Sequence, residues 1–391
     1  MLYNSALYMV RTERNTMRSL FFITLTTQAV LMFANQYDPH VFPADGPFME
    51  GWYARIIDFE SNHSFGILFG QVIRRKQDAH FNNYPLNMVS IIHSKGDESS
   101  MESFDVYPSS ENVEVTVRGK PVTEDPDFKS PANFEWRAKP YGYFRVNEHE
   151  TRFNFTNVSG VSFIGVLGPP RPWGPNGEGP EGWIDHVPFL PLHWFVYSLG
   201  SDLINYNWIN ENTGEMLRGN KGLVHQEKNW GKGFPPAWIW GEGVDGPSGS
   251  SFAISLGVLD IASFDIPAHL IGYRSSKVTL NFRPTNSWLT KHIDGCTGMM
   301  NATVEGFEHK LEFEIHAAPS TFQTCLLGPT EDGFAPILVE SYVALAKFHV
   351  YKSNFRGFEL IETRTFKSTA LEFGGLYLCM DKNPCKEKWL L

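Results

Sequence analysis

The sequence contains little charge and no cluster of basic residues. Of its 391 residues, 19% are charged, and the formal net charge is -10. Nucleic-acid-binding proteins usually carry a basic stripe or patch, so we expect no nucleic-acid partner. The chain also lacks a glycine-rich phosphate loop and a G-x-S-x-G motif between a strand and a helix. A nucleotide-binding enzyme and a hydrolase with a nucleophile elbow are therefore not indicated.

Cysteine is scarce and is confined to the last third of the chain. The four cysteines are Cys296, Cys325, Cys379 and Cys385, without a C-x-x-C pair or a histidine pair nearby. This spacing does not match a zinc site, and we expect neither a metal nor another cofactor. An even count in a secreted chain predicts two disulfides with three possible connectivities. We favour a local Cys379–Cys385 loop and a Cys296–Cys325 link between strands; four free thiols are the alternative.

The N-terminus has the pattern of a secretory signal peptide. Arg11, Arg14 and Arg18 precede an apolar run at residues 20–34. This run is shorter than the roughly 20 residues that span a bilayer, so we expect no stable transmembrane segment. The pattern predicts a signal peptide at residues 1–34 and a secreted mature protein, with an uncleaved signal anchor as the alternative.

Sequons for N-glycosylation add weak support for secretion, because such triplets are common by chance. They occur at Asn62, Asn154, Asn157 and Asn301. Asn154 and Asn157 are too close for us to expect glycans on both.

Most of the chain has the pattern of β-strands, and no long amphipathic helix with caps is evident. Strand-like segments are residues 64–75, 86–93, 113–118, 252–260, 278–282, 311–316 and 342–350. In LEFEIH (311–316), apolar and polar residues alternate as they do in a half-buried strand. Many short strands predict an all-β sandwich or barrel. The Pro- and Gly-rich residues 168–182 predict a loop, either a linker or a flap over a site.

The stretch HQEKNWGKGFPPAWIWGEG (225–243) places charged residues among tryptophans. On an extended chain, His225, Glu227 and Asn229 point to one side. Desolvation beside indole rings raises the pKa of a carboxylic acid, which can then donate a proton at neutral pH. Tryptophan faces can also stabilise a carbocation. The alternative is structural: Glu227 pairs with Lys228, and the tryptophans belong to the core.

Four segments resemble landmarks of the tocopherol cyclase family. They are FMEGWYARI (48–56), GWIDHVPFLPLHWFVYSLG (182–200), EKNWGKGFPPAWIW (227–240) and STALEFGG (368–375). They occur in the family order and span nearly the whole mature chain. The wider group includes carotenoid hydratase-like and Diels–Alderase-like proteins.

This resemblance implies two lipocalin-like antiparallel β-barrels packed together, which we place at residues 35–200 and 201–391. It also implies an apolar pocket and ring closure, hydration or cycloaddition of prenylated substrates, without metal or redox cofactor. The secretory N-terminus departs from plant members of the family, which act in plastids.

Individual residues then receive candidate roles. Glu227 would supply or orient a proton, Asn229 would anchor a quinol or carbonyl oxygen, and His193 would relay a proton; for each, a structural role is the alternative. The candidate ligand-binding residues are Glu50, Trp52, Trp194, Trp230, Trp238 and Trp240. The sequence thus predicts a secreted protein that binds an isoprenoid or prenylquinol-type ligand and catalyses its cyclisation or isomerisation. The alternative is a non-catalytic extracellular lipid-binding or matrix protein, and the oligomeric state is open.

Overall fold

The computed structural model describes residues 46–74, 84–97, 99, 101–121, 134–147, 150–187, 190–261 and 264–386. The predicted signal peptide at residues 1–34 lies outside this part of the chain. The described residues form strands and short 3-10 helices, with no α-helix among them. None of their helices has the length and hydropathy of a membrane span. The prediction of an all-β fold is confirmed.

The first half of the chain forms an antiparallel sheet, which has thirteen strands within the described residues and the order β4-β3-β2-β1-β13-β11-β10-β9-β8-β7-β5-β6, with β12 paired to β11. Its strands are β1 (Phe48–Asp58), β2 (Ser64–Ile73), β3 (Asn87–Ser94), β4 (Glu102–Val106), β5 (Val113–Val117), β6 (Lys120–Pro121), β7 (Phe134–Ala138), β8 (Gly142–Val146), β9 (Thr151–Val158), β10 (Val161–Leu167), β11 (Leu192–Asn210), β12 (Glu215–Gly219) and β13 (Gly222–Gly231).

The second half forms another antiparallel sheet, with ten strands within the described residues and the order β17-β16-β15-β14-β23-β22-β20-β19-β18, with β21 paired to β22. Its strands are β14 (Ala237–Asp245), β15 (Ser250–Ile261), β16 (Phe264–Arg274), β17 (Thr279–Phe282), β18 (Ser287–Asp294), β19 (Met299–Gly306), β20 (His309–His316), β21 (Cys325–Thr330), β22 (Gly333–Asn354) and β23 (Gly357–Gly375). The 3-10 helices are η1 (Ser110–Asn112), η2 (Gly182–His186), η3 (Pro319–Phe322) and η4 (Met380–Lys382).

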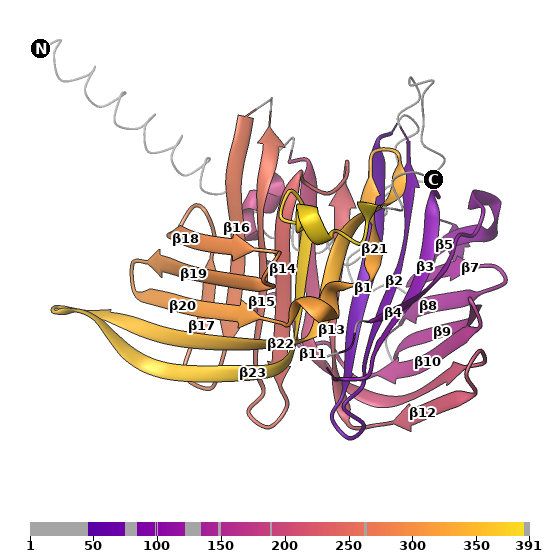
Figure 1. The fold of residues 1–391 in the computed structure, drawn as a ribbon, viewed down its shortest axis with the longest axis horizontal. Coiled ribbons are helices and arrows are strands. Elements are labelled where there is room, and N and C mark those ends of the chain that lie inside the picture. The colour runs from indigo at the N-terminus through magenta and orange to yellow at the C-terminus, as the bar shows by residue number, and fades with distance from the viewer. Residues whose placement is uncertain are drawn as a thin grey trace, which may run out of the picture.

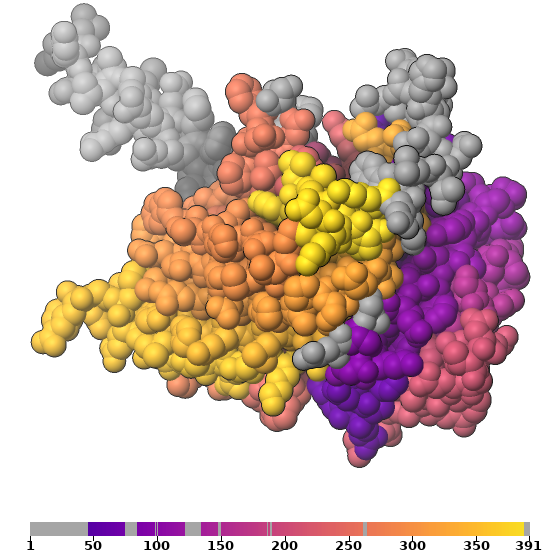
Figure 2. All heavy atoms as spheres, viewed as in Figure 1, coloured from indigo at the N-terminus to yellow at the C-terminus, as the bar shows by residue number. Residues whose placement is uncertain are grey.

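The two curved sheets lie side by side (Figure 1) and meet along one seam (Figure 2), as the predicted pair of lipocalin-like barrels requires. The chain passes from one sheet to the other between Gly231 and Ala237. The division that we placed at residues 200 and 201 falls inside β11, a strand of the first sheet.

Each sheet encloses its own apolar core, and a third apolar cluster fills the seam. The first core is rich in aromatics, including Phe65, Phe163 and Trp208. The seam cluster includes Trp194 and Trp240, one from each sheet. The seven segments predicted as strands all overlap strands of the structure. In β20, Leu311, Phe313 and Ile315 point into the second core, and their polar neighbours point outward, as the alternation predicts.

The favoured disulfide pairing is wrong. The bonds join Cys296 to Cys379 and Cys325 to Cys385. Sequence proximity suggested a loop between Cys379 and Cys385, but the intervening residues form η4 (Met380–Lys382), and the two cysteines reach different parts of the second sheet. Cys379 bonds to the turn between β18 and β19, whereas Cys385 bonds to the first residue of β21. Both bonds tie the C-terminal segment to the second half.

Candidate functional site

A cavity of about 370 Å³ lies between the two sheets. Strands β1–β4, β11 and β13 line it from the first sheet, and β14–β16 and β21–β23 line it from the second. Most of the wall is apolar, including Leu256, Leu270 and Leu338. Its size is that of a small-molecule pocket, in which a few polar groups fix the ligand's orientation.

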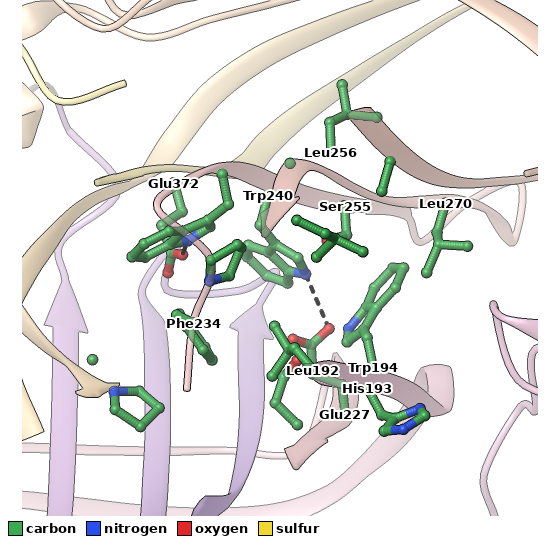
Figure 3. A pocket seen from close by; sticks show the side chains of 18 of the residues that line it. Leu192, His193, Trp194, Glu227, Phe234, Trp240, Ser255, Leu256, Leu270 and Glu372 are labelled. Carbon is green, nitrogen blue, oxygen red and sulfur yellow. Dashed lines mark hydrogen bonds between the residues drawn. The ribbon is translucent and has the colours of Figure 1, made fainter. Parts of the chain in front are cut away.

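The alternation of β13 divides the E-K-N-W sequence between two faces of the first sheet. Glu227 and Asn229 line the cavity, together with Trp194 of β11 and Trp238 and Trp240 of β14. Figure 3 shows Glu227, Trp194 and Trp240 grouped in the cavity wall. With His193, which lies at the edge, the structure therefore brings six of the nine candidate catalytic and ligand-binding residues together around the cavity.

Glu227 is held through one carboxylate oxygen. Its Oε2 accepts a hydrogen bond from Trp240 Nε1 at 3.1 Å (Figure 3) and lies 2.8 Å from His225 Nε2. The structural alternative proposed a pair between Glu227 and Lys228. The structure does not contain this pair, because consecutive residues of a strand point to opposite faces.

The other face of β1 and β13 holds a separate charged cluster. Lys228 Nζ lies 2.8 Å from Glu50 Oε1, and both side chains are 0% exposed. The ammonium also lies 4.8 Å from the centre of the Trp230 ring and 5.9 Å from that of Trp52. Trp52 belongs to the first core, where it stacks on Phe69. Glu50, Trp52 and Trp230 are thus not among the cavity-lining residues.

His193 lines the cavity at its edge and is bonded to the end of the Pro- and Gly-rich loop. Its Nδ1 lies 2.8 Å from Glu181 Oε2, and its ring stacks on Trp230 at 4.9 Å. Burial acts to lower the pKa of His193, but the bond and charge of Glu181 raise it above its ordinary value.

Glu181, Asp185 and His193 are the one group in the described chain whose ligand atoms cluster as a small cation would require, within 4.8 Å of one another. Both oxygens of Glu181 already take part in hydrogen bonds, one with His193 and the other with the backbone N–H of Trp194 at 2.7 Å. We therefore interpret the group as a tie between η2 and β11.

Residues 168–182 form hydrogen bonds with both sheets. The prediction of a loop is confirmed, since β10 ends at Leu167 and η2 begins at Gly182. Beyond the tie of Glu181 to β11, the guanidinium of Arg274 on β16 donates to the carbonyl of Trp173 at 2.6 Å. Trp183 and Ile184 of η2 then line the cavity.

Two further carboxyl groups enter the cavity wall from the second sheet. Glu340 of β22 and Glu372 of β23 are direct partners across the strand pair, and Trp240 of β14 is the next residue along the same rung. Glu372 accepts a hydrogen bond from Trp238 Nε1, and Glu340 accepts one from the Tyr53 hydroxyl at 3.0 Å. Like charges opposite each other on a buried strand pair repel strongly.

The two glutamates consequently hold protons more tightly than exposed glutamates do. Burial raises the pKa of Glu372 to about 7, the charge of Glu227 adds to the rise, and the Trp238 bond opposes it. Burial and the charge of Glu372 raise the pKa of Glu340 well above its ordinary value. Such acids retain a proton near neutral pH and can donate it.

A buried hydrogen-bond network supports these acids from the first sheet. The hydroxyl groups of Tyr53 and Tyr342 lie 2.7 Å apart. Arg55 pairs with Glu242 at 2.6 Å and lies 4.8 Å from the centre of the Tyr342 ring. The network fixes Tyr53 against Glu340, and so fixes one side of the acid pair.

Sequence reasoning missed Glu340, Glu372 and Tyr53. Signals were present: Glu372 is the glutamate of STALEFGG, Tyr53 is the tyrosine of EGWY, and Glu340 is the single charged residue in ILVESY. Their proximity depends on tertiary structure: β22 pairs with β23, and Tyr53 of the first sheet meets Glu340 of the second at a sequence separation of 287.

These features define a class: an all-β protein of two antiparallel sheets with an apolar cavity and buried acids between them. The sequence model of the tocopherol cyclase-like family matches residues 46–375, and the chain belongs to this family.

Two curated relatives are plant proteins. The chain is 27% identical over 202 residues to "Tocopherol cyclase, chloroplastic" of Zea mays, covering 50% of this chain and 41% of the relative. It is 26% identical over 202 residues to "Probable tocopherol cyclase, chloroplastic" of Oryza sativa subsp. japonica, covering 50% and 42%. The match thus spans less than half the length of each relative.

A solved structure shares the fold. The crystal structure of CghA with Sch210972 aligns with a TM-score of 0.56 and 11% identity, covering 86% of this chain and 93% of CghA. This likeness concerns the arrangement of the strands.

Proposed function

We propose that the protein is an enzyme that isomerises a hydrophobic small molecule by proton-initiated ring closure. The observation that carries this proposal is the placement of Glu372, with its pKa of about 7, in the wall of an apolar cavity beside indole rings. A buried acid that keeps a proton near neutral pH is the group needed to protonate an alkene.

The proposed reaction balances without a co-reactant. The Glu372 carboxyl transfers its proton to one alkene carbon, and a carbocation develops on the other. The faces of Trp238 and Trp240 stabilise this cation through their negative π-systems. A hydroxyl oxygen of the same substrate forms the new C–O bond and loses its proton, so that the product is an isomer of the substrate.

The ligand class follows from the cavity lining and from the relatives. No lysine or arginine is among the described residues that line the cavity. An anionic head group would therefore be desolvated without a partner, which is costly. A neutral isoprenoid or prenylquinol-type ligand fits this lining, with Asn229 available to bond its oxygen. The names of the plant relatives support the same class of ring closure.

The test compares wild type with Glu372→Gln in incubations with prenylquinols, followed by mass spectrometry and chiral chromatography of the extract. We expect Glu372→Gln to lower turnover by about 10²- to 10⁴-fold, as loss of a general acid does, while ligand uptake and circular dichroism stay unchanged. Glu314→Gln is the matched control, because Glu314 is exposed on β20. Equal turnover in Glu372→Gln would remove this residue from the mechanism.

A non-catalytic lipid carrier shares the apolar cavity but not the need for its acids. Uptake of prenylquinols by wild type without any conversion would favour the carrier. No uptake at all would favour a matrix protein.

We further propose that the protein acts in an oxidising compartment of the secretory pathway. Two disulfides support this proposal, since such bonds persist mainly in oxidising environments. Among the sequons, Asn62 and Asn157 are exposed, whereas Asn154 and Asn301 are partly buried in strands. Glycosylation stays a prediction, which mass spectrometry of the secreted protein with and without a glycosidase would test.

A further inference from the structure

His225 lies directly behind Glu227 and outside the cavity. The two residues share one face of β13, and His225 Nε2 lies 2.8 Å from Glu227 Oε2, with side chains 1% and 5% exposed. The imidazole also packs against the Trp240 indole, with ring centres 6.0 Å apart. Glu227 is among the described residues that line the cavity, and His225 is not. The imidazole therefore acts on the cavity only through residues that line it, namely Glu227 and Trp240.

The hydrogen bonds of Glu227 leave one oxygen available. Oε2 receives both Trp240 Nε1 and His225 Nε2. Within the described chain, no residue donates to Oε1. An ionised carboxylate only accepts hydrogen bonds, and an indole N–H only donates them. Glu227 is thus held by one oxygen in an accepting role and presents the other to a ligand.

The surroundings of His225 select one tautomer. Its Nδ1 is buried and has no hydrogen-bond partner among the described residues. On the neighbouring strand β1, the residue opposite His225 is Arg55, whose guanidinium pairs with Glu242 at 2.6 Å. A proton on Nδ1 would be a buried, unsatisfied donor beside this cation, which costs free energy. The neutral imidazole with its proton on Nε2 avoids this cost and donates to Glu227.

We infer that His225 is a positioning residue that orients Glu227 as the proton acceptor of the proposed ring closure. This inference rests on the proposed function. Glu372 gives its proton to the alkene carbon, the C–O bond forms, and the O–H bond of the closing hydroxyl breaks. That proton goes to Glu227 Oε1 and then returns to Glu372 after the product leaves, so that no atom or electron is gained or lost. Glu227 thereby receives a proton rather than supplying one.

The first experiment measures the tautomer without requiring turnover. Protein labelled with ¹⁵N-histidine is studied by NMR, and the His225 signals are assigned from their loss in His225→Gln. We expect an Nε2–H tautomer in wild type, with an Nε2–H proton shift that changes in Glu227→Gln. An Nδ1–H tautomer would overturn the inference. An Nε2–H proton shift that stays the same in Glu227→Gln would also overturn it.

The second experiment compares His225→Phe with His225→Gln in the prenylquinol assay. Loss of a hydrogen bond to a charged group weakens the interaction by about 10- to 100-fold. We expect His225→Phe to lower kcat by this factor with KM unchanged. His225→Gln should recover part of the loss, because its amide N–H can donate to Glu227.

The outcomes separate the two proposals. Wild-type turnover with an unaltered kcat in His225→Phe would overturn the role of His225 and leave the proposed function standing. Absence of turnover in wild type would overturn the proposed function and this role with it. If His225→Phe does not fold, the rate and KM of His225→Gln together with the NMR tautomer decide the question.

Discussion

On one face of β13, Lys228 is paired with Glu50 and enclosed by Trp52 and Trp230; on the other face, Glu227 shares a cavity with Glu340 and Glu372. Both faces bury charged residue types. Lys228 pairs with the carboxylate on the first face, whereas the buried cation near the second face, Arg55, pairs with Glu242 and not with the three cavity glutamates. The second face supplies indole N–H and tyrosine O–H donors. Burial without a directly paired cation raises the pKa of Glu340 and Glu372. The comparison thus separates a structural ion pair, Lys228–Glu50, from carboxyl groups that can hold and transfer a proton.

The first way to break this comparison is to remove the fixed cation. Lys228→Met removes the cation that pairs with the buried Glu50, and loss of one member of a buried ion pair costs about 3–5 kcal/mol. Chemical denaturation should show this loss in the free energy of unfolding. Lys221→Met is the matched control, because the Lys221–Glu60 pair is exposed at 67% and 53%; its effect should be much smaller. Equal effects in the two variants would mean that Lys228 is not a structural cation.

The second prediction concerns the pH dependence of stability on the cavity face. Burial raises the pKa of Glu372 from 4.5 to about 7, a change that corresponds to about 3 kcal/mol. Because the folded state binds this proton more tightly than the unfolded state, the contribution is fully present below pH 4.5 and is lost as pH rises to about 7.

Unfolding free energies at pH 4.5 and pH 8 measure this linkage. Wild type should lose more stability over this interval than Glu372→Gln, which cannot titrate at this position. The same pH dependence in both proteins would show that Glu372 has an ordinary pKa.

The smallest expected effect comes from removing the single hydrogen bond that Trp240 donates to Glu227. Trp240→Phe keeps an aromatic ring but removes the N–H that bonds Glu227. A hydrogen bond to a charged group contributes about 1.5–3 kcal/mol, so we expect turnover to fall about 10-fold or somewhat more. Trp194→Phe is the comparison, because the buried Trp194 Nε1 has no hydrogen-bond partner among the described residues. Its loss should be smaller, and a larger loss in Trp194→Phe would contradict the assignment.

Local patterns predicted much of the fold. Alternation along residues 311–316 gave the inward and outward faces of β20 correctly. The same period of two placed Glu227 and Asn229 on one side of β13, and both line the cavity. That period also excludes the Glu227–Lys228 pair, although the two are neighbours in sequence. These features depend only on the geometry of one extended strand.

Features that depend on contacts between different strands could not be predicted from such patterns. Glu340 and Glu372 meet because β22 pairs with β23, and Tyr53 reaches Glu340 across the seam. The disulfides follow the path of the C-terminal segment around η4, which the spacing of the cysteines does not reveal. A resemblance of STALEFGG to a family landmark pointed to the segment that contains Glu372, but not to its partner.

The cavity wall has a division that bears on how such a protein can evolve. The described acids that line it stand on β4, β13, β22 and β23 and just before η2. Strands β15 and β16 contribute no carboxyl group to the described lining and supply residues such as Leu256, Ile266 and Leu270. Substitutions on β15 and β16 can therefore reshape the cavity without displacing a carboxyl group. The ligand can consequently change while the proton chemistry is retained. One scaffold can acquire new ligands by substitutions on two adjacent strands.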